Sequence, residues 1–117
     1  MRTHQRNALN VGLLLGALAL FACHRVTGQE SEPAAQVVGA RIVEAACGQC
    51  QFELAGDGCD LAVRVDGRAY FVDGTSIDDH GDAHAADGFC NAVRNARASG
   101  AVVGERFQST AFELVAE

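Results

Sequence analysis

L61-A62-V63-R64-V65-D66-G67-R68-A69-Y70-F71-V72 is the stretch that decides the fold. Residues 61–65 and 69–72 are rich in β-branched and aromatic side chains, which are enriched in strands. Between them lies Asp66-Gly67, a pair that readily adopts the positive φ angles of a tight hairpin turn. The stretch therefore predicts two antiparallel strands joined by a short turn, and a domain built mainly of such strands.

Three further strands are predicted on either side of this hairpin. Residues 37–45 are rich in Val and Ile and are flanked by Gly-containing segments, which is typical of a strand. Near the C-terminus, residues 101–103 and 106–115 flank Gly104-Glu105 and predict a second hairpin. The chain is thus expected to hold five strands.

The segment between the two hairpins has a different period. From Asp82 to Ala98, apolar residues recur at i, i+4, i+7, i+8 and i+11, namely Ala85, Phe89, Ala92, Val93 and Ala96. This spacing predicts one helical stripe, and Gly100 follows it as a C-cap. We expect the helix to pack Phe89 and Val93 against the end of the strands.

The predicted order is β-β-β-α-β-β, which is the order of an OB-like fold. In that fold five strands close a small Greek-key barrel, and the helix lies between the third and the fourth strand. We therefore expect a mainly β domain with one helix, with an α+β two-layer sandwich as the alternative.

The N-terminus predicts export. Arg2 and Arg6 precede an uncharged run from Val11 to Ala22, which has the length of a signal h-region and is too short to span a bilayer. It ends in L20-F21-A22-C23, which resembles a bacterial lipobox with Cys23 as the lipidated residue. The prediction is a lipoprotein signal over 1–22, a flexible tether over 23–36 and a domain over 37–117, in a protein anchored by lipid to a membrane of the bacterial cell envelope. Ordinary signal-peptidase cleavage is the alternative.

The charge of the chain limits its partners. The formal net charge is −6, Lys is absent, and all 15 acidic residues follow Cys23. Because nucleic-acid affinity depends on basic side chains that displace counterions, nucleic acid is not an expected partner. Cationic metals or a basic protein partner suit this domain better.

Four cysteines lie in the predicted domain: Cys47, Cys50, Cys59 and Cys90. An even number in an oxidising compartment is typical of two disulfides, whose pairing the spacing leaves open. A C-x-x-C turn also offers two thiolates that converge on one ion, so a Zn or Cu site is the other interpretation.

The segment D78-D79-H80-G81-D82-A83-H84 adds two imidazoles to this set. His80 and His84 are predicted as further metal ligands. Asp78, Asp79 and Asp82 are predicted to cap the helix or to support those ligands, since acidic groups favour a helix N-terminus. A calcium loop is not favoured by the spacing, because His80 and Ala83 occupy its third and sixth positions, where an oxygen ligand and glycine are typical.

The blocks C47-G48-Q49-C50-Q51-F52, G58-C59-D60-L61-A62-V63, the histidine segment 78–84 and G88-F89-C90 resemble a family of short exported bacterial proteins classed as a domain of unknown function. The resemblance covers about residues 40 to 116. It implies that these blocks belong together, and it implies no activity.

Three functions follow as hypotheses. The first is a binding module that holds Cu or Zn through the Cys/His cluster, and the second is a disulfide-stapled module that contacts a partner protein. The third is a thiol–disulfide redox protein, which is less favoured because C47-G48-Q49-C50 runs into a glycine-containing segment instead of opening a long helix. An enzyme is not favoured, since Ser76 and Ser99 have no evident base partner.

Overall fold

The computed structural model of this protein describes residues 34–116. The predicted signal peptide, Cys23 and most of the predicted tether lie outside these residues. Within the described part, no helix is long and apolar enough to cross a membrane.

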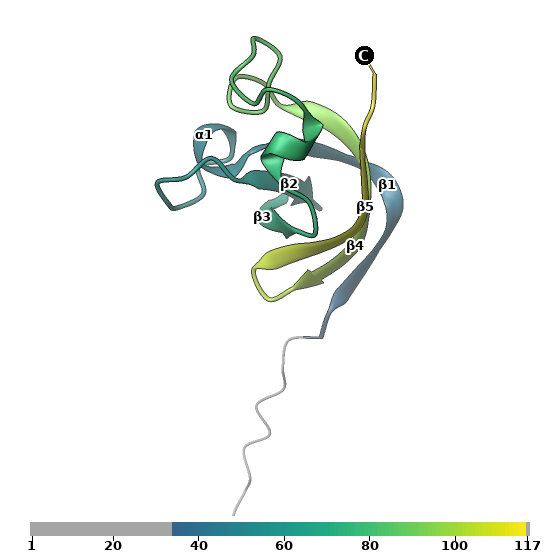
Figure 1. Ribbon diagram of the computed structural model, residues 1–117. Coiled ribbons are helices and arrows are strands. Elements are labelled where there is room, and N and C mark those ends of the chain that lie inside the picture. Colours follow the sequence, from purple (N-terminus) through teal and green to yellow (C-terminus); the bar gives the residue numbers. More distant parts are fainter. Residues whose placement is uncertain (1–33, 117) are drawn as a thin grey trace, which may run out of the picture.

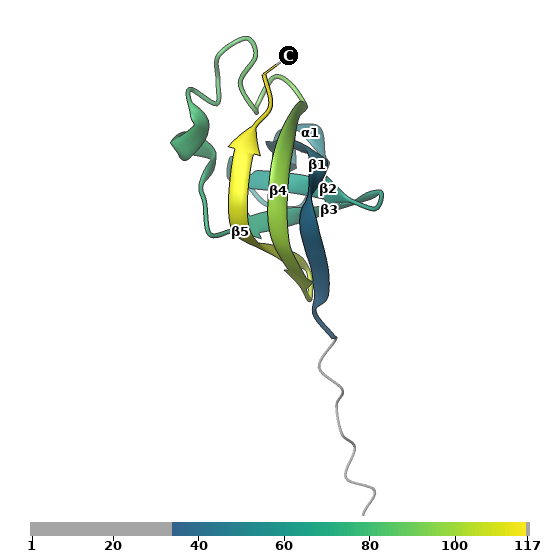
Figure 2. The same ribbon diagram turned by 90° about the vertical axis from the view of Figure 1, so that its right-hand side faces the viewer.

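Five strands form a closed barrel in the order β1-β2-β3-β5-β4, with β4 pairing back onto β1 (Figures 1 and 2). Their bounds are β1 Gln36–Cys47, β2 Leu61–Val65, β3 Arg68–Asp73, β4 Arg94–Val103 and β5 Arg106–Leu114. The described helices are short, α1 at Gly48–Gln51 and the 3₁₀ helix η1 at Ile77–His80. This confirms the mainly β class and the five-stranded OB-like barrel.

The hairpin at Asp66-Gly67 is confirmed. Both residues have positive φ, 51° and 86°, and Val65 pairs with Arg68 across the turn. The barrel then closes through a parallel pairing of β3 with β5, where Val72 lies opposite Phe107. The guanidinium of Arg106 on β5 binds both carboxylate oxygens of Asp73 on β3, at 2.7 to 2.9 Å, beside this parallel pairing.

The barrel interior is filled by aliphatic and aromatic side chains from all five strands, and Phe107 is fully buried in it. Phe89 and Ile77 join this core from the segment between β3 and β4. A smaller apolar cluster of Phe52, Ala46 and Ala62 forms separately, and Leu54 packs against it from the segment after α1. The segments that follow β1 and β3 are thus packed against the barrel by apolar contacts.

The predicted helix over 82–98 is wrong. Residues 83–91 form turns and bends, and from Arg94 the chain is strand β4. Phe89 is buried, at 3% exposure, but Val93 is 40% exposed, so these two side chains do not share one buried helical face.

Two local features explain why the helical spacing did not produce a helix. The chain folds back tightly at Gly88, where an added Cβ would collide with the carbonyl oxygens of Ala83 and Asp82. Beyond it, Ala96 and Ala98 are buried while Asn95 and Arg97 are exposed, a period of two that fits a strand. Pairing of β4 with both β1 and β5 therefore decides the structure of this segment, although the spacing of its apolar residues fits a helix.

Candidate metal centre

Three chain segments meet where β1 ends. Cys47 is the last residue of β1 and the N-cap of α1, and Cys50 lies within α1. Cys59 lies two residues before β2, and Cys90 lies in the segment between η1 and β4. The topology thus brings together cysteines that are up to 43 positions apart in the sequence.

Main-chain hydrogen bonds fasten these segments to one another. The Cys47 N–H donates to the Phe89 carbonyl at 2.9 Å, and the Gly48 N–H donates to the Asp60 carbonyl at 2.8 Å. These bonds hold the end of β1 against the residues next to Cys90 and next to Cys59. The positions of the cysteines are therefore set by the backbone as well as by the sulfurs.

Two glutamine amides add to this frame. Gln51 Nε2 donates to the carbonyl of Cys90 at 2.8 Å. Gln49 donates to the Asp60 carboxylate at 2.6 Å and accepts from the Asp60 N–H at 3.1 Å. Both glutamines belong to α1, so this short helix is held on one side by the Cys90 segment and on the other by the segment that enters β2.

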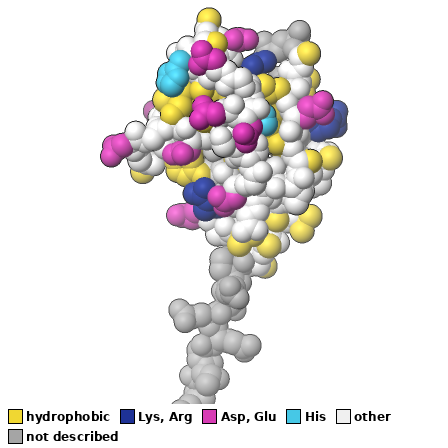
Figure 3. Space-filling view, in the orientation of Figure 1, with side chains coloured by type: hydrophobic (Ala, Val, Ile, Leu, Met, Phe, Trp, Pro, Cys, Tyr) yellow, Lys and Arg dark blue, Asp and Glu magenta, His cyan; other side chains and the backbone are white. Residues whose placement is uncertain are grey.

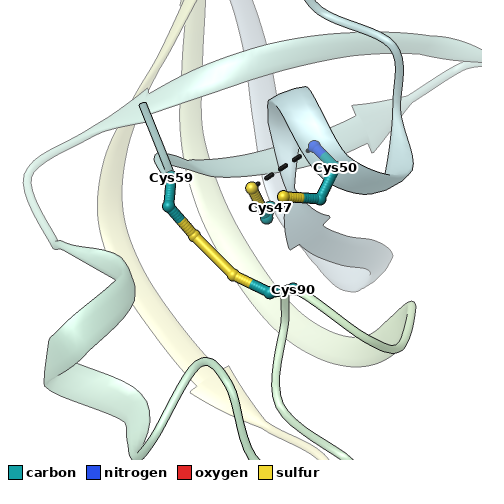
Figure 4. A group of neighbouring side chains, drawn as sticks. All are labelled: Cys47, Cys50, Cys59 and Cys90. Carbon is teal, nitrogen blue, oxygen red and sulfur yellow. Dashed lines mark hydrogen bonds between the residues drawn. A yellow bond between two sulfur atoms is a disulfide. The ribbon is translucent and has the colours of Figure 1, made fainter. Parts of the chain in front are cut away.

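The four sulfurs form one compact group, which we call the four-cysteine group (Figure 4). Every Sγ of Cys47, Cys50, Cys59 and Cys90 lies within 4.8 Å of every other. Cys59 and Cys90 are joined in a disulfide, whereas Cys47 and Cys50 are free thiols. Cys47 is buried and Cys50 is exposed, so the group reaches from the core to the surface.

The two free thiols interact with each other. The Cys50 N–H donates to Cys47 Sγ at 3.4 Å, shown as the dashed line in Figure 4. The pKa of Cys50 is raised, first by a separate side-chain hydrogen bond with Cys47, then by desolvation and by the charge of Cys47. Two thiolates so close repel each other, and a bound cation would remove that repulsion because metal-bound thiols are deprotonated.

The dimensions of the group suit a tetrahedral thiolate site. Zinc–sulfur bonds of about 2.3 Å in a regular tetrahedron place the sulfurs about 3.8 Å apart. Separations within 4.8 Å are therefore compatible with one ion after small side-chain movements. Four ligands are available only when the Cys59–Cys90 disulfide is reduced.

The structure does not bring the two predicted histidine ligands into this group, which among residues 34–116 consists of cysteines alone. His80 Nε2 lies 2.8 Å from Thr75 Oγ1, and its ring packs on Phe112 with centroids 4.6 Å apart. His84 is exposed, and its main-chain N–H donates to Asp82 Oδ1. His80 lines a separate hollow of about 190 Å³ with Phe89.

The aspartates of this segment organise turns. Asp79 closes a capping box of η1, in which its carboxylate accepts the Ser76 N–H at 2.8 Å. That bond, together with one from Thr75, lowers the pKa of Asp79. Asp82 accepts from the His84 N–H, and Asp78 is exposed with its own N–H donating to Ser76 Oγ. Ser76, and not an aspartate, is the N-cap.

Sequence reasoning missed α1 and the two glutamines that hold it. A signal for the tight packing is Gly48, where an added Cβ would lie 2.6 Å from Cε1 of Phe71. A glycine directly after Cys47 is thus required by close approach of the barrel wall.

Comparison with known proteins adds a family and no activity. No curated protein matches this chain, and no solved structure matches it. A family model matches residues 41–115, which include all four cysteines of the group. The chain therefore belongs to DUF6370, a family of unknown function.

Proposed function

We propose that this protein is a metal-binding module in which the thiolates of the four-cysteine group hold one Zn(II) or Cu(I) ion. The observation that carries the proposal is the convergence of four Sγ atoms from three chain segments within 4.8 Å of one another. A pair of disulfides requires only two separate pairs of sulfurs, whereas an ion requires all four around one point.

The frame of the site favours binding without refolding. The bonds from Cys47 to Phe89 and from Gly48 to Asp60 are main-chain bonds that involve no sulfur, so we expect them to persist when a metal binds or the disulfide is reduced. A ligand set that is already positioned loses less conformational freedom on binding, which increases affinity.

The donor set and the charge point to a soft or borderline cation. Thiolates select Zn(II) and Cu(I) over the hard ions Mg(II) and Ca(II). Figure 3 shows acidic side chains spread over the face that carries the loops, with few basic ones among them. This negative surface would attract cations towards the exposed Cys50.

The proposal extends to location. The h-region and the lipobox that ends at Cys23 support an exported protein anchored by lipid to a membrane of the bacterial cell envelope. In that setting the site would bind metal outside the cytoplasm.

The Cys59–Cys90 disulfide favours a second candidate, an interaction module without metal. Here the bridge would staple a small domain, and a surface of the barrel would contact a protein partner. The two candidates share a fold and differ in whether the reduced protein takes up an ion.

A zinc titration separates these candidates. The full chain carrying Cys23→Ser is reduced with a phosphine under nitrogen and titrated with Zn(II) against a chromophoric chelator, and stoichiometry is read by native mass spectrometry. We expect one zinc per chain and an affinity at least tenfold lower, about 1.4 kcal/mol, for Cys47→Ser in this background.

The matched control is His80→Ala with His84→Ala, which removes two potential ligands outside the four-cysteine group. We expect this variant to keep the affinity of the parent. Absence of zinc binding by the reduced parent would refute the metal-binding proposal and favour the disulfide-stapled module.

A further inference from the structure

The four-cysteine group holds a disulfide and a dithiol side by side. Cys59 and Cys90 are bridged, Cys47 and Cys50 are free, and all four sulfurs lie within 4.8 Å of one another. Disulfides rearrange when a thiolate attacks a nearby disulfide sulfur, and the rate depends on access of the attacking sulfur. The two free sulfurs of this group lie within 4.8 Å of both bridged sulfurs.

We infer that the four-cysteine group is a redox-gated metal site, in which the disulfide migrates between the Cys59–Cys90 pair and the Cys47–Cys50 pair and its reduction opens the site to metal. This inference rests on the proposed metal-binding function and adds its regulation.

The exchange balances within the chain. The thiolate of Cys47 attacks Cys59 or Cys90, a new sulfur–sulfur bond forms, the old bridge breaks, and its other sulfur leaves as a thiolate. Cys50 then attacks the sulfur of Cys47, which forms the Cys47–Cys50 disulfide and releases the second thiolate. No electrons enter or leave, and the protons lost by Cys47 and Cys50 are taken up by Cys59 and Cys90.

Local contacts suit these roles. Cys47 Sγ accepts the Cys50 N–H at 3.4 Å, and such a bond strengthens when the sulfur carries charge. Cys50 follows at the exposed edge, where it can resolve the mixed disulfide or meet an external dithiol.

Gating follows from the number of ligands. Any single disulfide, in either position, leaves two thiols for the ion instead of four. An external dithiol or a phosphine supplies two electrons to the bridge. The dithiol gives up its two protons and becomes a disulfide, whereas the phosphine becomes its oxide with oxygen from water, which also supplies the two protons. All four thiols then lose protons to the solvent as the metal binds.

Two hydrogen bonds next to the bridge do not involve its sulfurs. The main-chain bond from Cys47 to Phe89 and the Gln51 side-chain bond to the Cys90 carbonyl hold Cys90 against α1 independently of the bridge. We therefore expect reduction to free two sulfurs while their segments stay in place.

The test uses the full chain with Cys23→Ser, so that only the four sulfurs of the group are counted. The form with the single Cys59–Cys90 disulfide, free of oxidant, is incubated at neutral pH under nitrogen, quenched in acid at successive times, alkylated and mapped by peptide mass spectrometry. We expect disulfide-linked peptides of both the Cys59–Cys90 pair and the Cys47–Cys50 pair at equilibrium. Alkylation confined to Cys47 and Cys50 at all times would overturn the exchange.

Zinc affinity is then measured on the one-disulfide form and on the fully reduced form. We expect at least a tenfold loss in the one-disulfide form and full recovery after phosphine. Cys59→Ser with Cys90→Ser is the matched control: it lacks two ligands, so its affinity should stay at least tenfold below that of the reduced parent even after phosphine. Equal zinc affinity of the two forms would overturn the gating. No zinc affinity in the reduced form would overturn the proposed function, and the peptide map would then still test the disulfide exchange.

Discussion

Replacing Phe89 by Ala is the sharpest test of how the segment between β3 and β4 is packed. The ring is 3% exposed and belongs to the barrel core, with its centroid 6.5 Å from that of Phe112 and 6.3 Å from that of His80. Truncation of a buried Phe costs about 3–5 kcal/mol through lost burial and the cavity left behind. A domain of this size has a total stability of about 4–12 kcal/mol, so the loss should be large but measurable.

The assay is urea unfolding of the disulfide-containing protein, followed by circular dichroism, with Val93→Ala as the matched control. A helix over 82–98 would bury both side chains, whereas in the structure Val93 is 40% exposed. We expect Val93→Ala to change the free energy of unfolding by less than about 0.5 kcal/mol, as for most surface substitutions. A loss below about 1 kcal/mol for Phe89→Ala, or similar losses for both variants, would refute this packing.

Three further expectations concern the bridge, the parallel closure of the barrel and the anchor. Cys59→Ala with Cys90→Ala opens a loop that spans 31 positions, and in the chain-entropy model it should lower the free energy of unfolding by up to about 4 kcal/mol. Substitution of the exposed Cys50 by Ala should change this free energy little. Equal effects of the two variants in urea unfolding would contradict a stabilising bridge. The hydrogen bonds from Arg106 lower the pKa of Asp73, so its stabilising effect is present above the unfolded pKa of about 3.9 and is lost as pH falls through the folded pKa. Asp73→Asn should flatten that acid loss in urea midpoints taken between pH 6 and 2, and an unchanged pH profile would argue against the pairing. Cys23→Ser should move the protein out of the membrane fraction in a bacterial host, and fractionation like that of the parent would exclude lipidation at Cys23.

Much of the barrel could be predicted because its strands carry local signals. Asp66-Gly67 specifies a turn by backbone conformation alone, and the β-branched runs on either side need little tertiary information. The segment around Phe89 could not be predicted in this way. Its apolar spacing fits a helix, but the outcome depends on β4 pairing with two strands that are distant in the sequence.

The cysteines of the candidate site could be predicted from the sequence, whereas the residues that surround them could not. An OB-like order brings the segment of Cys90 close to the loop after β1, so convergence of the sulfurs follows from topology. The roles of Gln49 and Gln51 depend on which carbonyl or carboxylate each amide reaches after folding. The environment of His80 also depends on tertiary packing, because Phe112 lies on a strand more than 30 positions away.

X-ray absorption at the zinc edge tests the central claim most directly. The reduced full chain with Cys23→Ser is loaded with one equivalent of Zn(II), and the first coordination shell is counted by ligand type. The four-cysteine site predicts four sulfur ligands at about 2.3 Å and no nitrogen at about 2.0 Å. A shell containing histidine nitrogen, or fewer than four sulfurs, would contradict it, as would a protein that retains no zinc after gel filtration.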